Sequence, residues 1–197
     1  MHLNPKLVGA GVAAAIAAAL GYALLAAQDD EAEFKTLERD GAFSVRDYPR
    51  LLVAETVSLG MRESALTRGF LALADYIVGK DRAGQRIPMT VPVLADGDED
   101  GRGWRTRFVM PARYTPETLP LPGEEIAIRS LPARRIAAVR FAGEATDATL
   151  DAHEDALRGW MRGHALSAAG PVEHAFYNPP FTPGLLRRNE VLIPLAV

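Results

Sequence analysis

Residues 43–78, FSVRDYPRLLVAETVSLGMRESALTRGFLALADYIV, decide the fold because they join two hydrophobic patterns of different period. Phe43 to Val57 is rich in apolar and β-branched residues and is interrupted by Tyr48-Pro49, which predicts a strand with a break. Arg62 to Val78 predicts an amphipathic helix that ends near Gly79, because four apolar residues recur at helical spacing: Leu66, Phe70, Leu73 and Ile77.

Two more extended segments follow this helix. Arg86 to Leu94 and Trp104 to Met110 flank an acidic, glycine-rich turn at residues 96–101. The first half of the chain is therefore predicted to run strand, helix, strand, strand.

The second half repeats this order. Ile126 to Phe141 is extended and kinked near Pro132, and Leu150 to Leu166 is helical, with Thr146 or Asp147 as its expected N-cap. Two strands follow, at residues 172–177 and 189–195, on either side of a proline-rich loop.

Two units of this kind predict an α+β fold in which each unit lays one helix on a shared antiparallel sheet. We expect the sheet to be curved or barrel-like, because a half of four strands cannot cover its own apolar face. The halves share little sequence identity, so an ordinary α+β domain without an internal repeat stays open as the alternative.

The N-terminal region contains an uncharged apolar segment at residues 7–27. A helix of this length reaches about 30 Å, enough to span the core of a bilayer. Lys6 precedes the segment and an acidic run follows it, so the positive-inside rule places the rest of the chain on the extracytoplasmic side. The alternatives are a cleaved signal peptide and a buried helix of a soluble protein.

Composition excludes several classes of protein. The chain of 197 residues has no cysteine, which rules out disulfides, thiolate metal sites and a catalytic thiol. Its 22 basic and 25 acidic side chains give a net charge of −3, and no basic patch dominates, so we expect no nucleic-acid partner. Neither a nucleophile-elbow motif nor a phosphate-binding glycine loop is present.

The histidines are the first candidates for acid–base or metal chemistry, because no other unperturbed side chain titrates near neutrality. His153 and His164 border the apolar stripe of the second helix, but about 16 Å separates them, too far to share a small metal ion. His174 alternates with Val172 and Phe176 on the more apolar face of its strand. Such a histidine is more often a packed core residue than a ligand.

Several segments form an ordered set of motifs over about residues 35–196. They include Phe43-Ser44-Val45-Arg46 with Tyr48-Pro49, Tyr76-Ile77-Val78-Gly79-Lys80-Asp81, Ile87-Pro88-Met89-Thr90-Val91-Pro92-Val93, Phe108-Val109-Met110-Pro111 with Tyr114-Thr115, and Phe176-Tyr177-Asn178-Pro179-Pro180-Phe181-Thr182-Pro183 with Arg188-Asn189-Glu190-Val191. In the order and spacing of these segments the chain resembles the SOUL haem-binding protein family. Pro88 and His174 depart from residues that are common in the family at these positions.

The resemblance implies a distorted antiparallel β-barrel of two pseudo-repeats flanked by two α-helices, here behind an N-terminal transmembrane helix. It also implies reversible binding of haem or another tetrapyrrole, in capture, buffering or transfer rather than catalysis. We therefore expect a signal anchor or signal peptide at residues 1–28, a linker at 29–42 and a SOUL-like haem-binding domain at 43–197. The protein would be tethered to the bilayer through residues 7–27, with the domain in the periplasm or another extracytoplasmic space.

A haem site needs an apolar cleft, cations for two propionates and, in many proteins, an axial iron ligand. The expected walls, which could equally be plain core, are Leu66, Phe70, Met89, Leu157 and Met161. The expected propionate partners are Arg129, Arg134 and Arg135. The expected iron ligands are His174 and His153, followed by His164 and then Met89. A tetrapyrrole held by surface complementarity alone is the alternative to iron ligation.

Two other functions compete with haem binding. The first is a small-molecule-binding enzyme on the same fold, either a hydrolase or a haem-dependent peroxidase, which would need a strongly perturbed carboxyl group deep in a cleft. The second is an interaction protein whose apolar groove accepts a peptide helix.

Overall fold

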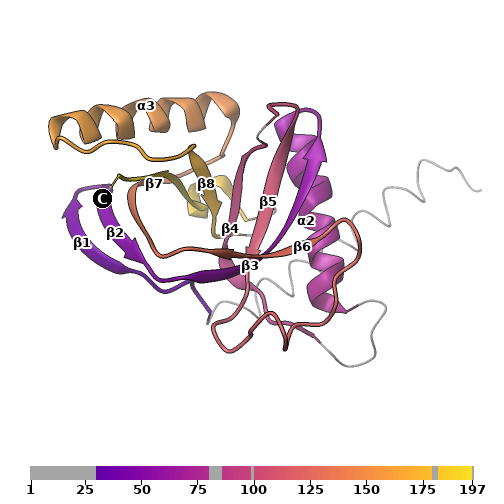
Figure 1. Ribbon diagram of the computed structural model, residues 1–197. Helices are drawn as coiled ribbons and strands as arrows, with labels where there is room; N and C mark the ends of the chain where they lie inside the picture. The colour runs from indigo at the N-terminus through magenta and orange to yellow at the C-terminus, as the bar shows by residue number, and fades with distance from the viewer. Residues whose placement is uncertain (1–29, 80–85, 99, 179–181, 197) are drawn as a thin grey trace, which may run out of the picture.

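The computed structural model describes residues 30–79, 86–98, 100–178 and 182–196 (Figure 1). The transmembrane helix expected at residues 7–27 lies outside the described residues. Among those that are described, no helix combines the length and the apolar character needed to cross a bilayer.

Nine strands form one antiparallel sheet in the order β1-β2-β7-β9-β8-β4-β5-β3-β6. Figure 1 shows the sheet strongly curled, with β1 and β2 at one end and β3, β5 and β6 at the other. The strands are β1 (Lys35–Asp40), β2 (Phe43–Tyr48), β3 (Leu51–Leu59), β4 (Thr90–Gly97), β5 (Gly103–Val109), β6 (Ala127–Leu131), β7 (Arg134–Ala142), β8 (Glu173–Phe176) and β9 (Arg188–Pro194).

Within the described ranges, two helices and a short 3-10 helix accompany the sheet: α2 (Arg62–Val78), α3 (Asp147–Gly163) and η1 (Gly184–Leu186). The helix predicted at 62–78 is confirmed, and Gly79 ends it in the left-handed conformation with φ 71°. Thr146 is the N-cap of α3, where its side chain accepts a hydrogen bond from the backbone N–H of Thr149.

The two halves of the chain exchange a strand. The first half contains β3, α2, β4 and β5, and the second contains β7, α3, β8 and β9 in the same order. The strand before each half, however, pairs with the other half: β2 pairs with β7, and β6 pairs with β3. The breaks at Tyr48-Pro49 and Pro132, which the sequence predicts, allow the chain to cross between the halves.

The α+β class is confirmed, but the barrel is not closed. In the part of the chain that the structure describes, β1 and β6 are the two edges of the sheet and do not pair with each other. The sheet is therefore a curled half-barrel whose hollow side remains open.

Residues 29–42, where the sequence predicts a linker, include the edge strand β1. Its side chains are all exposed, and its backbone pairs with β2 from Lys35 opposite Asp47 to Asp40 opposite Phe43. Because β1 (KTLERD) has no alternation of apolar and polar residues, its sequence carries little strand signal. Backbone pairing, rather than burial, forms this strand.

The helices pack on one face of the sheet, over two separate core clusters. Phe108 and Leu73 belong to the cluster under α2, and Leu157 and Val191 belong to the cluster under α3. The other face carries a third cluster that includes Ile136 and Leu192. Side chains alternate between the faces of a strand, so the charged neighbours of Ile136 and Leu192 on the same face point into the hollow.

Gly69 lets α2 approach the sheet closely. A Cβ atom at this position would lie 2.5 Å from Oγ1 and 3.0 Å from Cβ of Thr106, a buried residue of β5. Gly159 of α3 is the matched position, because its nearest neighbour would be the guanidinium of Arg162 at 3.6 Å.

We predict that Gly69→Ala lowers the free energy of unfolding by about 1–3 kcal/mol, because α2 must move away from β5 to avoid overpacking. Gly159→Ala is the control and should stabilise the protein by roughly 0.4–1 kcal/mol, because alanine restricts the unfolded chain. Denaturant titrations of both variants measure the two effects. Equal effects would show that α2 does not depend on the close approach.

Candidate functional site

The hollow face of the second half is organised around Glu190, whose side chain has no exposed area. Its carboxylate accepts hydrogen bonds from Arg46 at 2.7 and 3.1 Å, from the Tyr177 hydroxyl at 2.8 Å and from Arg188 at 3.2 Å. Every buried oxygen of Glu190 therefore has a charged or hydroxyl donor, as a buried carboxylate requires.

This network fixes the protonation states of its members. Burial opposes ionisation of Glu190, but hydrogen bonding and attraction from Arg46, helped by Arg188, lower its pKa overall. Burial also disfavours the charged form of Arg46. Hydrogen bonding to Glu190 and attraction by its charge outweigh burial, so the pKa of Arg46 is raised. Burial and the Glu190 charge raise the pKa of the Tyr177 hydroxyl, which stays protonated and donates.

A second ionic network lies toward the seam between β4 and β8. Arg107 donates to Asp96 at 2.7 Å and to Glu55 at 3.0 Å, and Arg134 donates to both oxygens of Glu173 at 2.5 and 2.8 Å. Burial raises the pKa of Asp96 to about 6, although Arg107 and Arg105 favour its charged form.

A cleft of about 550 Å³ opens between β2, β7, β9 and η1, next to the Glu190 network. We call it the arginine cleft, because five arginines line it: Arg39, Arg46, Arg140, Arg187 and Arg188. Its large apolar lining side chains are Phe34, Leu185 and Leu186. Phe43 and Phe141 also border the cleft, but their rings pack under α3 on Trp160 and His153. Leu185 and Leu186 are 90% and 71% exposed, so the apolar rim faces solvent. Glu190 is the only carboxylate among the lining residues.

The five arginines differ in how they are engaged. Arg46 and Arg188 bind carboxylates, and Arg187 donates its Nε to the Thr182 carbonyl at 2.7 Å. The exposed side chains of Arg39 and Arg140 make no ion pair or hydrogen bond within the described ranges of the chain. These two cations are therefore available to an anionic ligand.

The segment at residues 30–34 closes one side of the arginine cleft. Ala32 donates its backbone N–H to the Val91 carbonyl at 2.8 Å, and Glu31 accepts from both terminal nitrogens of Arg188 at 3.0 and 2.8 Å. Phe34 contacts Tyr48 with ring centroids 5.1 Å apart and lies under the guanidinium of Arg46. The chain thus reaches the cleft before β1 begins.

None of the histidines proposed as iron ligands lines the arginine cleft. His174 is 6% exposed on the helix-packed face, where its ring stacks on Trp104 at 5.9 Å. Its Nδ1 has no hydrogen-bond partner among the residues that the structure describes. His153 packs on the ring of Phe141 in the cluster under α3, and its Nδ1 lies 2.7 Å from the Thr149 carbonyl.

His164 lies at the C-terminal end of α3, where its Nδ1 is 2.9 Å from the Trp160 carbonyl and its Nε2 is 3.6 Å from Glu38. Met89 is buried in the cluster under α2. Neither residue is part of the cleft lining. Iron ligation by any of these four residues stays a prediction.

The expected wall residues do not form one wall. Phe70 and Met89 belong to the cluster under α2, whereas Leu157 and Met161 are buried in the separate cluster under α3. Leu66 is half-buried on α2. The helical spacing of the four residues on α2 and α3 indicates that they pack on the sheet, as the apolar face of any amphipathic helix does.

The expected propionate partners already have carboxylate partners. Arg129 lies 3.5 Å from Glu55, Arg134 binds Glu173, and Arg135 donates to Asp47 at 2.8 and 3.2 Å. The sequence gives no comparable signal for Arg39 and Arg140, which the fold brings to the cleft from β1 and β7. The sequence signal that could have indicated the rim is Leu185-Leu186-Arg187-Arg188, where exposed leucines adjoin arginines after a glycine.

Comparisons with known proteins agree on the fold. A family model described as SOUL heme-binding protein matches residues 29–194. Among solved structures, the EcmrR C-terminal domain matches with a TM-score of 0.58 and 12% identity, covering 78% of this chain and 96% of that one. A hydrolase from Listeria innocua matches with a TM-score of 0.55 and 12% identity, covering 81% and 94%. A comparison with curated proteins finds no match.

We predict that His174 makes the stability of the fold depend on pH. Burial, helped by the Arg62 charge, lowers the pKa of His174 from 6.5 to about 4, so the unfolded chain binds a proton that the folded chain rejects. The free energy of unfolding should therefore fall between pH 6.5 and 4 by up to about 3 kcal/mol from this residue.

Denaturant titrations of the wild type and His174→Gln across this range measure the effect. Asp96 acts in the opposite direction, because its raised pKa stabilises the fold as the pH falls. The difference between the two proteins isolates the contribution of His174. A difference that does not change with pH would contradict the prediction.

Proposed function

Because the chain belongs to the SOUL heme-binding protein family, we propose that it binds haem or a related tetrapyrrole reversibly in the arginine cleft. The observation that carries this proposal is a pair of cations without a partner in the described structure, Arg39 and Arg140, on one cleft with the Phe34 ring and the exposed Leu185 and Leu186. Haem, when bound, supplies an iron centre on a flat apolar ring with two carboxylates.

The lining residues fit the ring and its carboxylates. A volume of about 550 Å³ lies within the range of small-molecule pockets, and Phe34, Leu185 and Leu186 offer apolar surface for the ring. Arg39 and Arg140 would hold the propionates through charge-assisted hydrogen bonds. The described lining contains no histidine, methionine, cysteine or tyrosine side chain, so it fits a macrocycle held without a protein iron ligand.

The charges of the hollow face also favour an anionic ligand. The buried carboxylates Glu190 and Glu173 are neutralised by their own arginines, so the added charges of Arg39 and Arg140 are not cancelled locally. The whole chain, in contrast, has a net charge of −3. A positive cleft in an acidic protein concentrates anions at that cleft.

Membrane tethering forms part of the proposal. The uncharged residues 7–27 and the acidic residues after them support an anchor with the binding domain on the extracytoplasmic side. In this arrangement the cleft would capture, buffer or transfer a tetrapyrrole at the outer surface of the membrane, in the periplasm or an equivalent space.

The enzyme alternative is weaker. Asp96, whose pKa burial raises to about 6, is the perturbed carboxyl group that a hydrolase or a haem-dependent peroxidase would need. Its side chain is held by Arg107 and is absent from the described lining of the arginine cleft. This burial inside an ion-pair network supports a structural role for Asp96.

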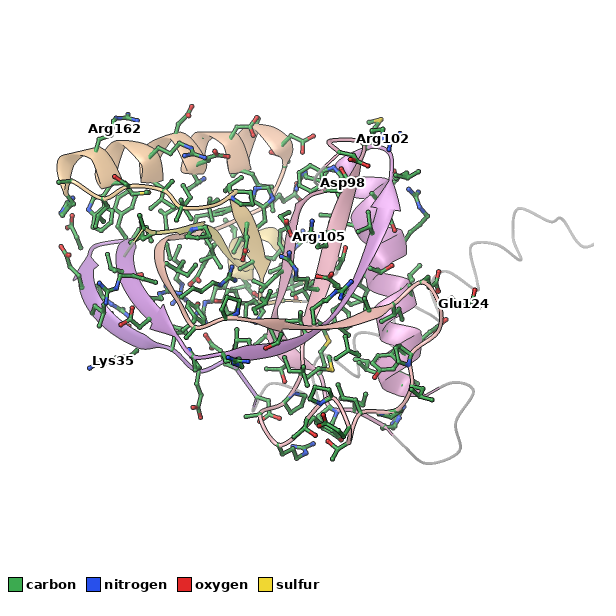
Figure 2. All side chains as sticks on the ribbon, viewed as in Figure 1. Lys35, Asp98, Arg102, Arg105, Glu124 and Arg162 are labelled. Atoms are coloured by element: carbon green, nitrogen blue, oxygen red, sulfur yellow. The ribbon has the colours of Figure 1, made fainter. Side chains whose placement is uncertain are left out.

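We predict that the full-length protein binds hemin with a saturable shift of the Soret band at about one equivalent. Arg39→Gln and Arg140→Gln should each weaken binding roughly threefold to tenfold, because each removes one ion pair with a propionate. Arg162→Gln, on the outer side of α3 in Figure 2, is the control and should bind like the wild type. The absence of a shift, for hemin and for metal-free porphyrin, would exclude the proposed function.

The same titration tests iron ligation. Because neither His153 nor His174 lines the arginine cleft, we predict that His153→Ala and His174→Ala leave the Soret spectrum of the hemin complex unchanged. A changed spectrum in one variant would identify that histidine as the axial ligand and would move the iron to the helix-packed face.

A further inference from the structure

Arg188 is already occupied by carboxylates of the chain itself. Its Nη1 donates to Glu31 at 3.0 Å, and its Nη2 donates to Glu31 at 2.8 Å and to Glu190 at 3.2 Å. The guanidinium also lies over the Tyr177 ring, 3.6 Å from its centroid. Both terminal nitrogens are therefore engaged while Glu31 is in place.

The two carboxylates that hold Arg188 differ in character. Glu190 is a buried part of the sheet and is fixed by Arg46 and Tyr177. Glu31 has a 40% exposed side chain and comes from the segment that crosses the hollow face before β1. Removing the Glu31 carboxylate would thus free Nη1 of Arg188 while leaving the Glu190 network intact.

The backbone keeps Glu31 next to Arg188. Val91 donates its N–H to the Asp30 carbonyl at 3.0 Å and accepts from the Ala32 N–H at 2.8 Å, so Glu31 is clamped on both sides. An intramolecular carboxylate held in this way competes with a ligand carboxylate at a high effective concentration.

Two arginines of the cleft, Arg39 and Arg140, have no partner among the described residues and remain for a ligand. Arg39 is on β1 and Arg140 is on β7, the two strands that flank β2. Adjacent strands are about 4.8 Å apart, which separates the two strands by roughly 10 Å. This spacing suits two carboxylates on one ring rather than a single group.

We infer that Glu31 determines which tetrapyrroles the arginine cleft accepts: by occupying Arg188, it limits the cleft to ligands with two carboxylates and disfavours those with four. The inference rests on the proposed function, since it concerns the same cleft. Glu31 is a specificity-determining residue that acts through Arg188.

The test compares protoporphyrin, with two carboxylates, and coproporphyrin, with four, by fluorescence titration of the full-length protein. The wild type should bind protoporphyrin more tightly. Glu31→Gln should raise the affinity for coproporphyrin about tenfold, because a third arginine becomes available, and should change the affinity for protoporphyrin much less. Glu31→Asp, which restores the charge, should return the preference toward that of the wild type.

Glu33→Gln is the matched control, because Glu33 is an exposed neighbour whose side chain makes no ion pair within the described residues. It removes the same charge and should leave the ratio of the two affinities unchanged. Equal ratios in the wild type and Glu31→Gln, or an equal shift in Glu33→Gln, would overturn the role of Glu31 while porphyrin binding itself stands. Failure of the wild type to bind either porphyrin would overturn the proposed function together with this inference.

Discussion

The ion pair between Arg46 and Glu190 organises the hollow side of the fold. A carboxylate with no exposed area is stable only when its charge is matched and its oxygens accept hydrogen bonds, and here Arg46 of β2, Tyr177 just after β8 and Arg188 of β9 all donate to it. Because β2 comes from the first half of the chain and β9 from the second, the ion pair joins the halves across β7. Members of this network also line the arginine cleft. The contacts that neutralise the buried carboxylate therefore also fix the geometry of the cleft.

The sequence was informative where a local pattern had a single structural solution. The helix at 62–78 and the Thr146 cap followed from periodicity and capping chemistry, and the chain breaks at Tyr48-Pro49 and Pro132 followed from proline geometry. The strand β1 was not predictable in the same way, since its side chains are exposed and only its backbone is paired. The open sheet was also not predictable, because closure depends on whether two edges meet in space.

The candidate site was harder to predict than the fold, for a physical reason. Apolar residues at helical spacing, such as Leu157 and Met161, mark a helix that packs on a sheet, and that signal is identical whether or not a ligand is nearby. Arg39 and Arg140 acquire their role only when β1 and β7 are placed on either side of β2. An arginine is free or paired according to the side chains that the fold places beside it. Arg134 forms an ion pair with Glu173, which is distant in sequence, whereas Arg140 forms no ion pair in the described structure.

The strand exchange between the halves also governs how the chain can acquire its structure as it emerges during synthesis. β2 is made early and can pair with β1 at once, but its central partner β7 and the strand β9 beyond it come from the second half of the chain. The apolar side chains of β2 that pack under α3 therefore stay uncovered until the second half has been made. Contacts so distant in sequence are slow to form, and the uncovered apolar side chains favour misassembly until they do.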